Sequence, residues 1–339
     1  IRDVYKRQLL RRVCMKHCVS ARRSLSLHIY LCISWETVHS MLHLLQRGIR
    51  VPMKSYLPCA TNTFRKARAW ARWAAFYSSA PPESQVYCGK DDTPLVRTEY
   101  LSDKRIWILH MLAQETPDNR LTHTFIEHGL LPALRDVRMH WASWVKESNT
   151  ADGAALVTTA PMDNKIFSNG LDLINALRDP HFFNDHLNKL FRELLTFPIP
   201  TVASVGGHAF AAGFTLALAH DYRVMNSERG YLCMNEIEFG APIPKGMLGV
   251  ITSVARQPSL QRKIVLEGHR FTAPEALEQG LIDATSKGQQ GTLDVAVALA
   301  DRLRSRCAKN AWQAIRELLK EEAILSQYEP PKAHISVSI

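Results

Sequence analysis

The sequence lacks the features that mark disulfide-rich, zinc-binding or membrane-spanning proteins. Its seven cysteines are odd in number, and no two of them form a CxxC pair. This scatter argues against a disulfide framework and against a structural metal site, and it is typical of a reducing compartment. No uninterrupted apolar run reaches membrane-spanning length, so no membrane span is expected. No GxGxxG or Walker-type loop occurs either, which disfavours a nucleotide-phosphate site.

Acidic residues are almost missing from the first quarter of the chain. Residues 1–80 contain 15 Lys or Arg and two acids, whereas the whole chain has 42 basic and 32 acidic residues. The other 259 residues therefore hold 27 basic and 30 acidic groups and are close to neutral. Because the excess positive charge lies in one segment, the net charge of +10 does not indicate a nucleic-acid-binding body.

Residues 1–92 are predicted to form a basic extension outside the main domain. The chain begins with Ile, as a fragment or an unprocessed translation does, and Met53 is a candidate start. Residues 64–73 follow the pattern of a basic amphipathic helix, which is typical of a mitochondrial transit peptide. The alternative is a non-native or disordered basic tail. Residues 328–339 are predicted to form a C-terminal tail that lacks a peroxisomal targeting tripeptide.

Between these ends, residues 93–327 show alternating strand and helix patterns. Strands are predicted at 106–109, 154–159, 201–205 and 221–225, and helices at 122–138 and 184–197. Such alternation predicts an α/β layer with parallel strand pairs. Residues 259–327 are expected to be mostly helical, with helices at 260–266, 273–279 and 293–323, the last broken near 307–310.

Two loops rich in small residues follow predicted strands. The first reads Phe167-Ser168-Asn169-Gly170-Leu171-Asp172-Leu173, where Gly170 can turn a neighbouring N–H outward. The second, Gly206 to Gly213, precedes a helix, whose N-terminus favours an anion. The structural alternatives are an ordinary Asn-Gly turn and tight helix packing. His208 is expected to be a packed histidine, because no nucleophile elbow accompanies it.

A carboxylate pair lies in the apolar stretch that follows. Burial would raise the pKa of Glu236 and suit it to acid/base work near neutrality. Glu238 is its rival, and the two would share a face on a strand but diverge on a helix. Two solvated carboxylates in a loop are the alternative.

In order and spacing, these segments resemble the enoyl-CoA hydratase/isomerase (crotonase) superfamily over about residues 93–327. They are most similar to the plant and fungal type of Δ3,Δ2-enoyl-CoA isomerase. The matching motifs are Phe167–Leu173, Gly207-His208-Ala209-Phe210-Ala211-Ala212-Gly213-Phe214, His220-Asp221-Tyr222-Arg223-Val224 and Asn235-Glu236. The resemblance implies an α/β fold, a crotonase-like spiral of ββα units with a helical C-terminal region.

The resemblance also implies roles for individual residues. The two amides of an oxyanion hole fall on Asn169 and Ala212, and the catalytic acid/base falls on Glu236. Hydratases of the family use a second glutamate, and Thr215 occupies that position here, which favours isomerase over hydratase. The implied contacts with the acyl-CoA substrate fall on Ser168, Gly170, Leu171 and Asp172.

The activity implied is transfer of a double bond from C3 to C2 of a fatty acyl-CoA, in the β-oxidation of unsaturated fatty acids. No cofactor or metal is expected, because CoA belongs to the substrate. A homotrimer or a dimer of trimers is expected, in mitochondria or peroxisomes. The alternatives are an enoyl-CoA hydratase or another crotonase-type enzyme, an RNA-binding protein on this fold, and a catalytically silent member. The neutral body disfavours nucleic acid as a partner.

Overall fold

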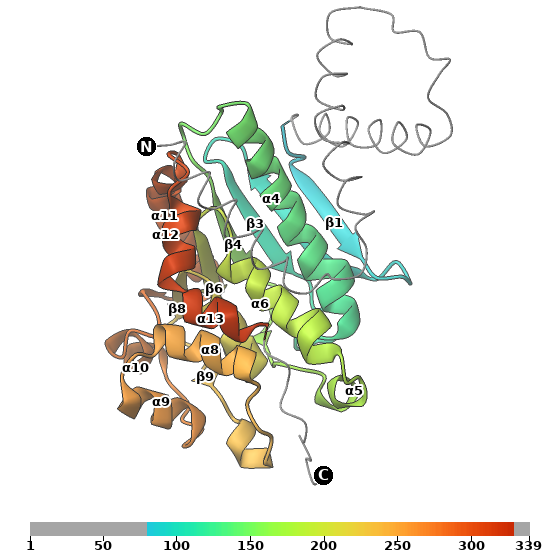
Figure 1. Ribbon diagram of the computed structural model, residues 1–339, viewed down its shortest axis with the longest axis vertical. Helices are drawn as coiled ribbons and strands as arrows, with labels where there is room; N and C mark the ends of the chain where they lie inside the picture. Colours follow the sequence, from blue (N-terminus) through green and yellow to red (C-terminus); the bar gives the residue numbers. More distant parts are fainter. Residues whose placement is uncertain (1–79, 329–339) are drawn as a thin grey trace, which may run out of the picture. The chain divides into compact units, whose positions relative to one another are not determined.

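Two sheets organise the part of the chain that the computed structural model describes, residues 80–328. The basic amphipathic segment, the candidate start at Met53 and the C-terminal tripeptide all lie outside these residues. The larger sheet has the strand order β1-β2-β3-β4-β6-β8-β10 (Figure 1). Its strands are β1 (Ser84–Cys88), β2 (Pro94–Leu101), β3 (Ile106–Met111), β4 (Ala155–Thr159), β6 (Thr201–Val205), β8 (Tyr222–Asn226) and β10 (Ala284–Ser286).

A smaller sheet has the order β5-β7-β9, and all its pairs are parallel. Its strands are β5 (Ile166–Ser168), β7 (His208–Phe210) and β9 (Leu232–Cys233). In the larger sheet β1, β2 and β3 pair antiparallel, whereas β3, β4, β6, β8 and β10 pair parallel. Along the chain, β4, β6 and β8 of the larger sheet are each followed by a strand of the smaller sheet, namely β5, β7 and β9. After β5 and after β7 the chain continues into a helix. This repeat is the ββα spiral that the sequence predicts by resemblance.

Side chains alternate between the two faces of the larger sheet, as the pleat requires. Ile106 and Ile108 of β3 join one apolar cluster with α11, and Trp107 and Leu109 join the cluster on the opposite face. Strands buried on both faces are typical of parallel sheets covered by helices. The larger sheet thus has an apolar cluster on each of its two faces.

The α-helices are α4 (Leu131–Lys146), α5 (Leu173–Arg178), α6 (Asn188–Leu195), α7 (Ala212–Ala219), α8 (Lys245–Val254), α9 (Pro258–Val265), α10 (Ala273–Glu278), α11 (Gln289–Arg304), α12 (Trp312–Leu319) and α13 (Glu321–Ser326). Two π-helical turns, η1 (Phe125–Leu130) and η2 (Phe182–Leu187), lead into α4 and α6. Two 3₁₀ turns are η3 (Glu236–Phe239) and η4 (Ser305–Cys307). No helix in residues 80–328 combines the length and apolarity that crossing a membrane requires.

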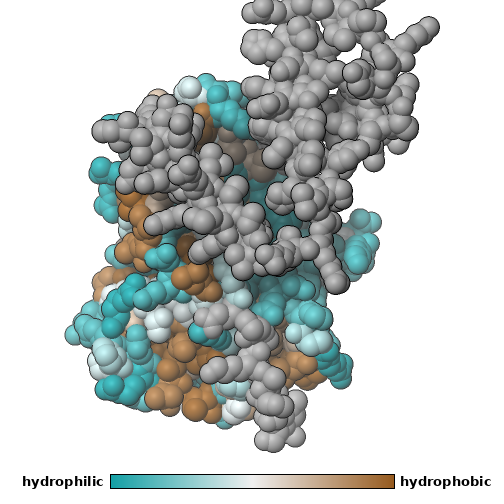
Figure 2. All heavy atoms as spheres, in the orientation of Figure 1, coloured by the Kyte–Doolittle hydropathy of each residue, from teal (hydrophilic) through white to brown (hydrophobic). Residues whose placement is uncertain are grey.

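Large apolar side chains remain exposed on the C-terminal helices. Ile315, Leu318 and Leu319 of α12 and Leu325 of α13 are between 58% and 74% exposed. Figure 2 shows hydrophobic residues among hydrophilic ones on the face where Figure 1 draws these helices. A helix pair with this composition has an apolar side that the described chain leaves uncovered.

The predicted strands and the break in the C-terminal helices are confirmed. The helix predicted at 122–138 continues to Lys146, because the apolar spacing persists through Trp141 and Trp144, which are buried. The short strands β7, β9 and β10 were not predicted. With two or three residues each, they carry no periodicity that a sequence pattern can reveal.

The predicted boundary at residue 92 is wrong at its C-terminal end. Strand β1 lies inside the predicted extension and pairs with β2, with Val86 opposite Arg97. The turn between them is closed by a hydrogen bond from the amide of Gly89 to the carbonyl of Thr93, 2.9 Å long. The sheet therefore begins at Ser84, with a hairpin between β1 and β2.

Candidate active site

The site residues follow the three strands of the smaller sheet. The loop after β5 carries Asn169 and Leu171, α7 begins directly after β7, and η3 begins at Glu236 after β9. Because parallel strands end at the same edge of a sheet, all three connections meet there. Segments that are about 40 and 25 residues apart in sequence are thereby brought to one place.

The first two connections touch through their backbones. A Cβ on Gly170 would lie 2.8 Å from the Cβ of Ala211 and 3.1 Å from the amide nitrogen of Ala212. A Cβ on Gly213 would lie 2.2 Å from the carbonyl oxygen of Ser168. Neither position has room for a side chain, so both glycines serve the close approach of these segments.

Helix α7 starts from a strained residue. Ala211 has φ 53° and ψ −128°, a region that residues with a Cβ rarely adopt. Its amide donates to the carbonyl of Cys233 over 2.8 Å, which fixes this conformation. The next residue, Ala212, is the first of the helix, where the N–H has no acceptor within the helix. An amide at this end of the helix dipole favours a negatively charged oxygen.

The amide of Asn169 is not free in the same way. Its N–H donates to the carbonyl of Asp118 over 3.0 Å, and its side-chain amide donates to the Asp118 carboxylate over 2.9 Å. The expectation that the Asn169 N–H serves an oxyanion therefore conflicts with its hydrogen bond. Leu171 follows Gly170, whose φ is +83°, and among the described backbone groups we find no acceptor for its N–H.

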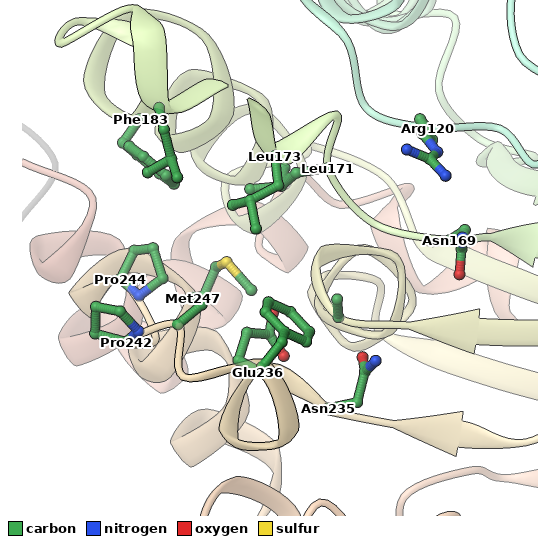
Figure 3. A pocket seen from close by; sticks show the side chains of 14 residues that line it. Arg120, Asn169, Leu171, Leu173, Phe183, Asn235, Glu236, Pro242, Pro244 and Met247 are labelled. Atoms are coloured by element: carbon green, nitrogen blue, oxygen red, sulfur yellow. The ribbon is translucent and has the colours of Figure 1, made fainter. Parts of the chain in front are cut away.

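A cavity of about 190 Å³ lies where the three connections meet. Figure 3 shows that one end is apolar and that the other is polar, with Glu236 between them. The apolar end contains Leu173, Phe183, Pro242, Pro244 and Met247, and the polar end contains Arg120, Asn169 and Asn235. Leu177 also lines the cavity. Such a cavity suits a ligand with an apolar chain and a polar group near Glu236.

Glu236 is the only acidic residue among the described residues that line the cavity. Its side chain is buried, with 6% exposure, and its Oε2 is buried without a hydrogen-bond partner. Burial raises the pKa of Glu236 to about 7, as predicted from its apolar neighbours. A carboxyl group with this pKa can both accept and return a proton near neutrality.

The residues that rival or accompany Glu236 lie elsewhere. Glu238 is exposed on the same 3₁₀ turn and lies 3.8 Å from Arg270, so the turn separates the two carboxylates as a helix would. Thr215 is fully buried and its hydroxyl donates to the carbonyl of Ala211 over 3.4 Å. His208 packs beside the rings of Phe210 and Tyr231 and does not line the cavity.

Of the four predicted substrate contacts, only Leu171 lines the cavity. Ser168 is fully buried and donates to the carbonyl of Asn119 over 2.8 Å, so its hydroxyl holds the loop in place. Asp172 accepts a hydrogen bond from Asn175 at the start of α5. Arg120 and the apolar wall from α5, η2 and α8 were not predicted, because no local motif marks these residues.

The fold and the site together define an enzyme-like α/β protein with one buried carboxylate beside a helix N-terminus. A sequence profile described as Enoyl-CoA hydratase/isomerase matches residues 146–333. The chain belongs to the enoyl-CoA hydratase/isomerase family.

Named relatives agree with this assignment. Enoyl-CoA delta isomerase 1, peroxisomal, of Arabidopsis thaliana is 30% identical over 203 residues, which cover 59% of this chain and 84% of the relative. Enoyl-CoA delta isomerase 3 of the same plant is 30% identical, over 47% of this chain and 70% of the relative. The 2,3-dehydroadipyl-CoA hydratase of Escherichia coli is 31% identical, over 52% of this chain and 68% of the relative.

Solved structures show the same fold. An enoyl-CoA hydratase from Mycobacterium marinum superposes with a TM-score of 0.54 and 23% identity, covering 68% of this chain and 94% of that one. A methylmalonyl-CoA decarboxylase bound to 2-nitronate-propionyl-CoA has the same TM-score with 19% identity, covering 70% and 85%. At these identities the likeness concerns the fold alone, which confirms the crotonase-type architecture.

Proposed function

We propose that this protein is a Δ3,Δ2-enoyl-CoA isomerase that moves a double bond from C3 to C2 of a fatty acyl-CoA. The observation that carries the proposal is Glu236, a single buried carboxylate with a pKa near 7 in an apolar cavity. Two relatives with isomerase names at 30% identity support this activity over others of the family.

The thioester oxygen binds at the N-terminus of α7, where the N–H of Ala212 donates to it. We assign the second donor to the N–H of Leu171 rather than to that of Asn169, whose hydrogen already bonds to Asp118. Two preorganised amides stabilise the negative charge that develops on this oxygen, and one such donor is typically worth about 10²–10³ in rate.

Glu236 transfers the proton. Its carboxylate removes a proton from C2, the electron pair of the C–H bond forms the dienolate, and the charge rests on the thioester oxygen. The protonated Glu236 then returns a proton to C4, so the double bond lies between C2 and C3. No net proton or electron is consumed, so the reaction needs no second reactant.

Hydration is the competing activity, because a hydratase is among the relatives. Adding water uses two coordinated carboxylates in hydratases of this family, and Thr215 stands where the second is expected. Its hydroxyl is buried against Ala211 and does not line the cavity. This geometry supports proton transfer within the substrate over water addition.

The decisive experiment compares Glu236→Gln with wild type on a 3-enoyl-CoA, following the ultraviolet absorbance of the conjugated product. We expect kcat to fall by about 10²–10⁴-fold, the usual worth of a general acid/base. Glu238→Gln, an exposed carboxylate on the same turn, is the matched control and should keep wild-type activity. Equal activities of all three proteins contradict the assignment, and water addition to a 2-enoyl-CoA at a rate rivalling isomerisation favours the hydratase.

The proposed reaction is a step in the β-oxidation of unsaturated fatty acids. The compartments proposed for the protein are the peroxisome and the mitochondrion. The relative enoyl-CoA delta isomerase 1 carries "peroxisomal" in its name, which supports the first. The basic segment that favours mitochondria lies outside the described residues. Imaging of the full chain fused to a fluorescent protein at its N-terminus or at its C-terminus distinguishes the two compartments.

A further inference from the structure

A second cluster of titratable side chains lies among the residues around the π-helical turns η1 and η2. It consists of His123, which precedes η1, Asp179, which follows α5, and His186 of η2. One ligand atom from each lies within 4.8 Å of the others. Three separate segments thus bring two imidazoles and a carboxylate to one point, and none of the three residues lines the cavity of Glu236.

We propose that His123, Asp179 and His186 bind a divalent transition-metal ion of the Zn²⁺ type. The Oδ2 of Asp179 lies 3.0 Å from Nε2 of His123 and 3.7 Å from Nε2 of His186. Zinc–ligand bonds of about 2.0–2.2 Å in a tetrahedral site place neighbouring ligand atoms roughly 3.4 Å apart. The two separations from Asp179 lie on either side of that value, and the ligand atoms of the two histidines lie within 4.8 Å of each other, so the histidines must close in on the ion.

A further carboxylate lies beside one of the imidazoles. Oε1 of Glu127, in η1, lies 3.2 Å from Nδ1 of His186. Metal-binding histidines commonly donate the second ring N–H to a carboxylate, which fixes the tautomer and directs the other nitrogen at the metal. Nδ1 of His186 makes no hydrogen bond in this structure, so a small rotation of the ring or of Glu127 is needed for it to donate. Nε2, the atom that faces Asp179, would then be free to bind the ion. The ring also stacks on Phe182, with a 27° angle between the planes.

The exposure of the cluster suits an exchangeable ion. The side chains of His123 and Asp179 are 35% and 31% exposed, whereas His186 is 14% exposed. An ion can therefore enter from solvent and keep a water as its fourth ligand. Because η2 also carries Phe183 on the cavity wall, the ion cross-links that wall to the start of η1.

The test is calorimetric titration of ZnCl₂ into the full-length protein after removal of metal by a chelator. Because the chain holds 14 His and seven Cys, single-residue variants rather than stoichiometry decide the outcome. We expect His186→Asn and Asp179→Asn each to remove the tightest site or to weaken it at least about tenfold. Glu127→Gln, which removes the negative charge beside Nδ1 of His186, should weaken it by about 10–100-fold.

His181→Asn is the matched control. His181 lies on the same segment, with its side chain 74% exposed and its Nδ1 4.0 Å from Asp185, outside the cluster. Unchanged zinc affinity in His186→Asn and Asp179→Asn overturns the proposal, as does an equal loss in His181→Asn.

A second measurement covers the case in which a variant folds poorly. Co²⁺ added to the metal-free wild-type protein should give the intense visible absorption of a four-coordinate site. That absorption should disappear in His123→Asn and persist in His181→Asn. Its absence from the wild-type protein overturns the proposal. Neither measurement depends on isomerase activity, so this site and the proposed function fail independently.

Discussion

At the scale of single residues, burial distinguishes two glutamates of the same type and nearly the same place in the sequence. Glu236 and Glu238 are two residues apart on one 3₁₀ turn, yet only Glu236 is buried against the cavity. Burial disfavours its ionised form and raises its pKa, while Glu238 remains in water beside Arg270. The sequence could propose both residues, and only their placement separates them.

The pH dependence of isomerisation should report Glu236. Burial raises its pKa to about 7, and the group must be ionised to accept the C2 proton. We therefore expect kcat/KM to rise with pH below about 7 and to level off above it. A pH–rate profile of the wild-type enzyme measures this midpoint. A profile that stays flat from pH 5 upward, or one that falls across this range, contradicts the role of Glu236 as base.

The close approach at Gly170 gives a second prediction for single residues. In Gly170→Ala the new Cβ meets Ala211 and the amide of Ala212, so the proposed oxyanion donor must move. We expect kcat to fall by about 10²–10³-fold, as when one donor is lost. Gly280→Ala is the control, since Gly280 has a positive φ of 69° but no neighbour within 4 Å of the added Cβ. Equal kcat losses in the two variants would show that backbone strain, and not the donor, is responsible.

At the scale of elements, a buried ion network attaches the C-terminal helices to the larger sheet. Asp221, just before β8, accepts a hydrogen bond from Arg316 of α12, lies 3.3 Å from Lys320 and accepts a third bond from the amide of Thr201. Burial alone would raise the pKa of Asp221, but the two cations outweigh it and lower the pKa to about 2. The carboxylate of Asp221 therefore connects β6 and the C-terminal helices to the segment before β8, although these segments are distant in sequence.

Removing that carboxylate should destabilise the protein strongly. Asp221→Asn leaves the buried guanidinium and ammonium without their counter-charge, which typically costs about 3–5 kcal/mol. Urea unfolding followed by circular dichroism measures the change. Glu322→Gln is the control, because its ion pair with Arg256 is 3.8 Å long and solvent-exposed. A loss no larger than that of Glu322→Gln would contradict the network.

The elements also show why the fold was easier to predict than the site. Strands β4 and β6 carry runs of apolar and β-branched residues, and both were predicted within one residue of their ends. Strands β7 and β9 have three and two residues and exist through pairing with one another and with β5. Since these three strands align the connections that line the cavity, local sequence patterns could not show that the connections meet.

At the scale of the whole molecule, the exposed apolar side of α12 and α13 is the feature to explain. The expected homotrimer or dimer of trimers stays a prediction, and this surface is where a subunit contact would bury apolar area. It comprises Ile315, Leu318, Leu319 and Leu325. Among residues 80–328, no segment covers these four side chains.

We expect sedimentation equilibrium to give a mass of three or six chains. Leu318→Glu, which places a charge in the middle of this surface, should lower the mass toward that of one chain. Leu266→Glu is the control, because Leu266 is 61% exposed at the end of α9, outside the surface. A wild-type mass of one chain would contradict the expected trimer or dimer of trimers. An equal fall in mass in Leu318→Glu and Leu266→Glu would show that the subunit contact does not depend on this surface in particular.

The sequence by itself determined the family and the main strands, and it singled out Glu236 as the candidate proton carrier, because motif spacing and apolar periodicity are local properties. Only the tertiary structure decided the rest. It showed that the Asn169 amide is already bonded to Asp118, that Thr215 is buried away from the cavity, and that Ser84 begins the sheet. It also brought His123 and His186 to Asp179, although they lie 56 and seven residues away in sequence. Hydrogen bonds, burial and side-chain convergence of this kind join distant segments, so they exist only once the chain has folded.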